Sequence, residues 1–120
     1  MNMRIQQFGG VSKIELEGRL DADGVDAVGA DFSAHCDSTP NVIVDLGKVP
    51  YMASIGIRLL VVGAKAQAGI GGKMVLVGPN ELLRRILKTT GIDALMPVYD
   101  RVADAAAAFD TSSELPASGT

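Results

Sequence analysis

The amino-acid sequence predicts a single α/β domain built on a mixed β-sheet. Two observations lead to this prediction. A pair of strand patterns flanks Gly9-Gly10 near the N-terminus, and apolar strand patterns then alternate with helical patterns along the rest of the chain. The hairpin makes the sheet mixed, because strands joined through helices run parallel. We expect one domain over residues 1–110 and a disordered tail over 111–120, which is small and polar.

The hairpin strands are expected at Arg4–Phe8 and Lys13–Gly18. The second strand places apolar Ile14 and Leu16 between polar residues, and this period of two is typical of a strand with one buried face. Glycine adopts the positive φ that a tight hairpin turn needs, so Gly9-Gly10 is the expected turn.

A first helix is predicted to begin at Asp21 and to end in the stretch 37–41. Its apolar residues recur at spacings of three and four and form one stripe: Val25, Val28, Phe32 and Cys36. Gly24 and Gly29 each cost a helix about 1 kcal/mol relative to alanine. We therefore expect packing to hold this helix in place.

The middle of the chain predicts a buried strand, a short loop and a very apolar helix. Val42–Asp45 has the continuous apolar character of a central strand. The helix is expected from Ser54 to about Ala68. Leu59, Val62 and Ala66 define one apolar side, which Ile55, Ile57, Leu60, Val61 and Ala64 widen. A helix of this kind is mostly buried, or its extra apolar surface meets a partner.

The remaining elements follow in the same alternation. A strand is predicted at Lys73–Val77, a helix opening at Gly78-Pro79-Asn80 and ending at Gly91, a short strand at Met96–Tyr99 and a last helix at Val102–Phe109. The expected buried stripe of the third helix is Leu82, Leu83, Ile86, Leu87 and Thr90. The prediction is thus about four helices, packed largely on one face of the sheet.

Composition excludes several classes of protein. A net charge of −3 and five aromatic residues among 120 give no basic surface for direct nucleic-acid binding. Cys36 is the only cysteine, so no disulfide can form within the chain. The N-terminus lacks the apolar core of a signal peptide, and no apolar run reaches about 20 residues. We expect a soluble, cytoplasmic protein without membrane insertion.

The sequence contains no pattern typical of an enzyme or a metal site. His35 is the only histidine, no metal-ligand spacing surrounds it, and an ordinary surface or helix-end role is expected. The glycines at 69–72 lie between a helix and a strand, whereas phosphate-binding loops run from strand to helix. We therefore expect no catalysis, no metal and no cofactor.

Ser54 is the residue of greatest interest, because it stands where the second helix begins. Serine is a preferred N-cap, so capping is the simplest structural explanation. Unpaired N–H groups and the helix dipole also favour negative charge at this position.

Five segments, in order and spacing, resemble the STAS domain family, whose type members are anti-sigma factor antagonists. They are LEGRLD (16–21), NVIVDLGKVPYMASIGIRLL (41–60), GGKMVLVGP (71–79), LLRRILKTTGID (82–93) and MPVYDRVADAAAAF (96–109). The resemblance extends over about residues 3–109. It implies a mixed sheet with helices largely on one side, as the residue patterns also predict.

The resemblance also implies a site. In the family, a loop reading Asp-Ser-Ser/Thr/Ala-Gly precedes the second helix, and its first Ser or Thr is the phosphoacceptor. On this pattern Ser54 is the phosphoacceptor and Gly56 the motif glycine, while Ala53 stands where the family usually has aspartate. The expected partner-binding residues are Asp21, Met52, Ala53, Ile55, Gly56 and Ile57.

The function that the resemblance implies is a non-catalytic switch. The chain is expected to bind a serine-kinase anti-sigma factor, of the ATP-binding histidine-kinase-like type, and to release it once Ser54 is phosphorylated. ATP and Mg²⁺ would belong to that partner. Two alternatives stay open: an adaptor subunit of a lipid-transport ATPase or stressosome-like complex, and a domain that binds a small ligand or nucleotide. The sequence does not fix the oligomeric state.

Overall fold

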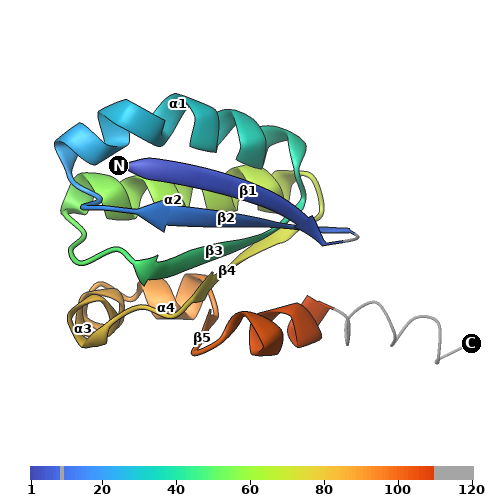
Figure 1. Ribbon diagram of the computed structural model, residues 1–120. Helices are drawn as coiled ribbons and strands as arrows, with labels where there is room; N and C mark the ends of the chain where they lie inside the picture. The colour runs from blue at the N-terminus through green and yellow to red at the C-terminus, as the bar shows by residue number, and fades with distance from the viewer. Residues whose placement is uncertain (9, 110–120) are drawn as a thin grey trace, which may run out of the picture.

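A five-stranded sheet forms the centre of the protein in the computed structural model, which describes residues 1–8 and 10–109 (Figure 1). The strands are β1 (Asn2–Phe8), β2 (Val11–Glu17), β3 (Asn41–Lys48), β4 (Lys73–Val77) and β5 (Val98–Tyr99). The helices are α1 (Ala22–Ser38), α2 (Ser54–Gly69), α3 (Glu81–Thr89) and α4 (Ile92–Leu95), and residues 102–109 are also helical.

The strands lie in sequence order across the sheet, with β3 in the middle. The β1–β2 pair is antiparallel and the other three pairs are parallel, which confirms the predicted mixed sheet. Val44 pairs with Ile14 on one side and with Leu76 on the other, and all three are fully buried. The prediction of a central buried strand at Val42–Asp45 is confirmed.

Helices cover the two faces of the sheet unequally. One face, which includes Leu16, Val44 and Leu76, packs against residues of α1, α2, α3 and α4 in a single core cluster. The opposite face contributes Ile43, Val75 and Val77 to a smaller cluster, which Ala105 and Phe109 of the last helix complete. The helices therefore lie largely on one face, as predicted, and the last helix covers part of the other.

Glycines allow α1 and α2 to approach each other and the loops beside them. A Cβ on Gly63 would lie 3.0 Å from Sγ of Cys36 and 3.0 Å from Cε1 of Phe32. A Cβ on Gly24 would overlap the carbonyl oxygen of Arg19. Gly24 is thus more than a weakness in α1, because a larger residue does not fit beside the preceding loop.

The predicted apolar faces of two helices need correction. In α2 the buried residues are Gly56, Leu59, Leu60, Gly63 and Gln67. Val62, which the apolar periodicity groups with Leu59, is 51% exposed. In α3, Leu83 and Leu87 are buried, but Leu82 is 44% exposed and Thr90 is exposed too. The apolar periodicity overestimated the width of the buried face in both helices, because each helix carries apolar residues beyond the face that packs in the core.

Gln67 is the polar residue within the buried stripe of α2. Its Nε2 donates a hydrogen bond, 3.0 Å long, to the carbonyl oxygen of Thr39. This bond ties the end of α2 to the turn before β3 and offsets part of the cost of burying an amide.

The ends of the helices agree closely with the sequence prediction, whereas β3 extends beyond Asp45 to Lys48. Asn80 is the N-cap of α3 and accepts a hydrogen bond from the N–H of Leu83 at 2.8 Å. Gly91 ends α3 with a φ of 76°, the left-handed conformation expected of a C-terminal glycine. The short helix α4 was not predicted. The turn glycine Gly9 and the tail expected over 111–120 lie outside the described residues.

Candidate functional site at the start of helix α2

Two loops meet beside the start of α2 and hold each other in place. One precedes α1 and the other connects β3 to α2, and an isolated parallel bridge joins them at Leu20 and Met52. The N–H of Leu20 donates to the carbonyl oxygen of Tyr51 at 2.9 Å, and the N–H of Ala53 donates to that of Leu20 at 3.0 Å. Leu20 and Met52 are almost completely buried, so core packing anchors both loops.

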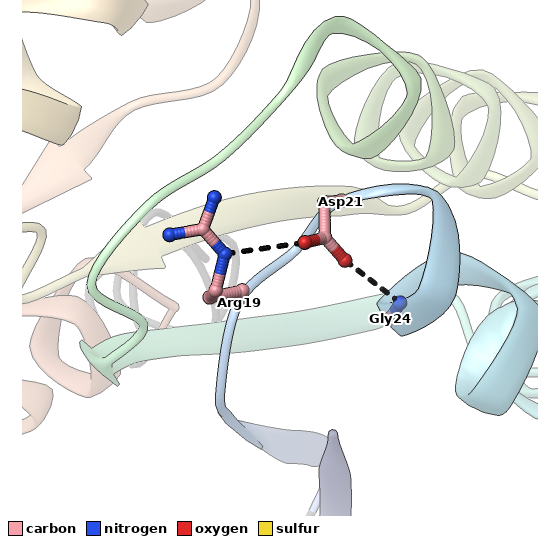
Figure 2. Close-up of polar contacts among 3 residues, drawn as sticks. All are labelled: Arg19, Asp21 and Gly24. Carbon is pink, nitrogen blue, oxygen red and sulfur yellow. Dashed lines mark hydrogen bonds and ion pairs between the residues drawn. The ribbon is translucent and has the colours of Figure 1, made fainter.

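The residues beside this bridge form a polar cluster. Figure 2 shows Asp21 between Arg19 and Gly24. Oδ1 of Asp21 accepts the N–H of Gly24 at 3.1 Å and so caps α1, while Oδ2 lies 3.2 Å from Nε of Arg19. The guanidinium of Arg19 also lies over the ring of Tyr51, 4.7 Å from its centre. The N–H of Gly24, and then Arg19, hold the pKa of Asp21 below its ordinary value of 3.8.

The structure corrects the expected capping role of Ser54. The N-cap of α2 is Ala53, which offers no side-chain acceptor, and Ser54 is the first helical residue. Ser54 is exposed, and no described residue hydrogen-bonds its hydroxyl. Since Asp21 and Asn80 cap their helices with side-chain oxygens, α2 differs from α1 and α3 in this respect. The Ser54 hydroxyl is therefore available for other chemistry.

Gly56 holds the start of α2 against the other loop. A Cβ at this position would overlap the carbonyl oxygen of Leu20 and lie 2.6 Å from its Cγ. Residue 56 therefore has to be glycine if α2 is to begin where it does. The position that the family pattern assigns to the motif glycine thus has a physical explanation in this chain.

The predicted partner-binding residues separate into surface and interior. Ile55 is 43% exposed, and Asp21, Ala53 and Ile57 are half-buried. Met52 is 1% exposed and Gly56 is buried, so neither can present a side chain to a partner. Met52 was expected among the partner-binding residues, and in this structure its side chain packs in the core.

One polar pair that was not predicted lies between β2 and α1. Oγ of Ser12 is hydrogen-bonded to Nε2 of His35 at 2.7 Å, and Nε2 of Gln7 donates to the same oxygen at 3.3 Å. Ser12 has no exposed surface, so a substrate cannot reach its hydroxyl. His35 is half-buried in the last turn of α1, which agrees with the helix-end role expected for it. The position of Ser12 on the same face of β2 as Ile14 and Leu16 was the available sequence signal.

Two further features are absent from residues 1–8 and 10–109. These residues contain no group of three or more His, Cys, Asp or Glu that could hold a metal ion. None of their helices has both the length and the apolar character needed to cross a membrane.

Known proteins share both the sequence pattern and the fold. The model of the STAS domain family matches residues 2–105. BtrV of Bordetella bronchiseptica, provisionally named an anti-sigma factor antagonist, is 26% identical over 113 residues, which are 93% of this chain and 97% of the relative.

Solved structures extend the comparison. An anti-sigma factor antagonist from Mycobacterium paratuberculosis is 26% identical, with a TM-score of 0.81 over 89% of this chain and 92% of that one. SpoIIAA of Bacillus in its phosphorylated form has a TM-score of 0.70 over 90% of this chain and 99% of that one. At 18% identity, SpoIIAA shows a shared fold. Because the family model covers nearly all of the described residues, the chain belongs to the STAS domain family.

Proposed function

We propose that this protein is an anti-sigma factor antagonist that binds a serine-kinase anti-sigma factor and is switched by phosphorylation of Ser54. The names of BtrV and of the Mycobacterium paratuberculosis protein support the general role. SpoIIAA, an anti-sigma factor antagonist with the same fold, has been solved in phosphorylated and unphosphorylated forms, which supports a phosphate-dependent step.

The observation that carries the proposal is the state of the Ser54 hydroxyl. It is exposed at the first residue of α2 and accepts no capping bond, because the N-cap position belongs to Ala53. A structural explanation for this serine is therefore absent from the residues that the structure describes. A kinase could reach the hydroxyl without unwinding α2 or opening the core.

The start of α2 also suits the product of phosphorylation. A phosphoserine carries about −1.5 to −2 charges, which the positive end of a helix dipole stabilises. The first turn of α2 contains no acidic residue that would repel it. Phosphorylation can thus change the surface beside exposed Ile55 without changing the fold.

Ala53 affects how the kinase would act. The family's usual carboxylate is absent at this position, and both oxygens of nearby Asp21 already have partners. Groups of the kinase itself must then orient the Ser54 hydroxyl. We infer that phosphate transfer is slow and that the Ala53→Asp substitution accelerates it.

The proposed role is regulatory, with catalysis left to the partner. The anti-sigma factor would carry ATP and Mg²⁺ and transfer the phosphate. This chain would supply the acceptor hydroxyl and a binding surface.

Two substitutions of Ser54 test the proposal. Purified anti-sigma factors of the source organism are titrated with the Ser54→Ala and Ser54→Asp variants, and phosphate transfer to the wild-type protein is followed by mass spectrometry. We expect tight binding of Ser54→Ala, weak binding of Ser54→Asp and modification of Ser54. Equal affinities combined with no transfer to the wild type would refute the switch.

A further inference from the structure

Ser54 and Arg58 lie one turn apart on the same side of α2. Residues four apart on a helix are neighbours on its surface, and both of these residues are exposed. Arg58 forms no ion pair or hydrogen bond with any residue in the described part of the chain. An uncommitted guanidinium thus stands within reach of the proposed phosphorylation site.

The arginine in the loop before α1, Arg19, is already engaged. Arg19 is paired with Asp21 through Nε (Figure 2), and its guanidinium lies over the ring of Tyr51. To bind a new anion, Arg19 would have to leave both partners. Arg58 has no such contacts to lose.

We propose that Arg58 is the internal ligand of the phosphate on Ser54. This inference rests on the proposed function, since it concerns the phosphorylated state. The order along the helix is favourable, because an acid that precedes a base by four residues forms the better of the two possible pairs. The planar guanidinium offers several N–H donors to phosphate oxygens, which a lysine at the same place would not match.

This pairing makes the switch act through two charges. With Ser54 unmodified, Arg58 presents a positive charge beside Ile55, where an acidic group of a partner can pair with it. Once Ser54 is phosphorylated, the phosphate adds negative charge and also occupies the guanidinium. The partner loses an attractive contact in addition to meeting a repulsive one.

The test uses full-length protein with phosphoserine installed at position 54 by genetic encoding, so that no kinase is needed. Its second phosphate pKa is measured by ³¹P NMR titration at low salt, and Arg58→Gln is compared with wild type. A neighbouring cation favours the dianion and lowers this pKa, so the substitution should raise it by roughly 0.2 to 0.4, the size expected of an exposed pair four residues apart.

Lys65→Gln provides the matched control, because Lys65 is the other basic residue of α2 and lies about 16 Å from Ser54 along the helix axis. It should leave the phosphate pKa unchanged, and Arg58→Lys should lower the pKa less than arginine does. An identical pKa in wild type and Arg58→Gln would overturn the inference. If Arg58→Gln shifts the phosphate pKa but no kinase modifies Ser54, the Arg58 contact stands and the proposed function is refuted instead.

Discussion

The carbonyl oxygen of Leu20 occupies the space that a Cβ on residue 56 would need. Through this contact, the loop before α1 determines which residue can stand at position 56, in the first turn of α2. The same Leu20 bridges to Met52 and accepts a hydrogen bond from Ala53. The conformation around Ser54 is therefore set by contacts that are distant in sequence.

Gly56→Ala should consequently disturb the start of α2. We expect a loss of about 1–3 kcal/mol in the free energy of unfolding, since the added methyl overpacks against backbone. Urea titrations followed by circular dichroism measure this loss. Gly69→Ala is the matched control in the same helix, because a Cβ there meets nothing within 4 Å. It should be neutral or stabilising, and equal losses in both variants would contradict the close approach at Gly56.

The carboxylate of Asp21 should make stability depend on pH. Its pKa is lowered in the folded protein, mainly by the N–H of Gly24 and then by Arg19, so its contribution is present above 3.8 and is lost as pH falls through the folded-state pKa. Asp21→Ala should therefore lower the melting temperature at pH 7 more than at pH 3. Asp21→Asn keeps an oxygen that can cap α1 and should lose less. If Asp21→Ala lowers the melting temperature by the same amount at both pH values, this role of the carboxylate is contradicted.

Substitutions at Ile55 and at Met52 should have different effects, the first on partner binding and the second on stability. Ile55→Ser removes an exposed side chain, so we expect an unchanged melting temperature and affinity for the anti-sigma factor reduced about fivefold or more. Val62→Ser is its control, since Val62 is comparably exposed two turns further along α2. Met52→Ala should instead cost about 2–5 kcal/mol in stability. Calorimetric titration and thermal denaturation measure the two effects, and equal losses of affinity in Ile55→Ser and Val62→Ser would remove Ile55 from the site.

The buried thiol of Cys36 should be unreactive, and it should lower the stability of the folded protein at high pH. Burial, with a smaller effect of Asp37, raises its pKa from 9.0 to about 11. Below pH 9 the thiol is protonated in the folded and in the unfolded protein. Above pH 9 the thiol of the unfolded chain ionises first. Stability should thus fall by at most about 1.4 kcal/mol per pH unit between pH 9 and 11. A Cys36→Ala variant that loses as much stability over this range would contradict the assignment.

A thiol reagent provides a second check on Cys36. At pH 8 we expect the native protein to react much more slowly than the urea-unfolded protein, because the thiolate is the reactive form and the side chain is fully buried. Equal rates would show that Cys36 is accessible.

The order of the elements could be predicted from the sequence because local patterns determine it. A few neighbouring residues are enough to predict the strand at Val42–Asp45 and the helix end at Gly91. Ser54 was also located correctly at the start of α2. These features depend on periodicity and on backbone preferences, which one sequence displays.

The details of the site could not be predicted, because contacts between distant segments decide them. Whether Ser54 or Ala53 takes the N-cap position depends on the bond from Ala53 to Leu20, more than 30 residues earlier. The burial of Met52 also depends on contacts between distant segments. Its apolar side chain would suit a core and an interface equally well, so the sequence alone does not decide between them. The hydrogen bond between Ser12 and His35 joins a strand to the far end of a helix, a pairing that neither residue's neighbours indicate.

The most direct test of the proposed switch compares one protein in two states. The anti-sigma factor is titrated calorimetrically with the wild-type chain and with the same chain carrying phosphoserine at position 54. The account predicts that the phosphate weakens binding at least about tenfold, or 1.4 kcal/mol, while circular dichroism shows the same fold in both. Equal affinities of the two forms for the anti-sigma factor that binds the wild type would contradict the central claim.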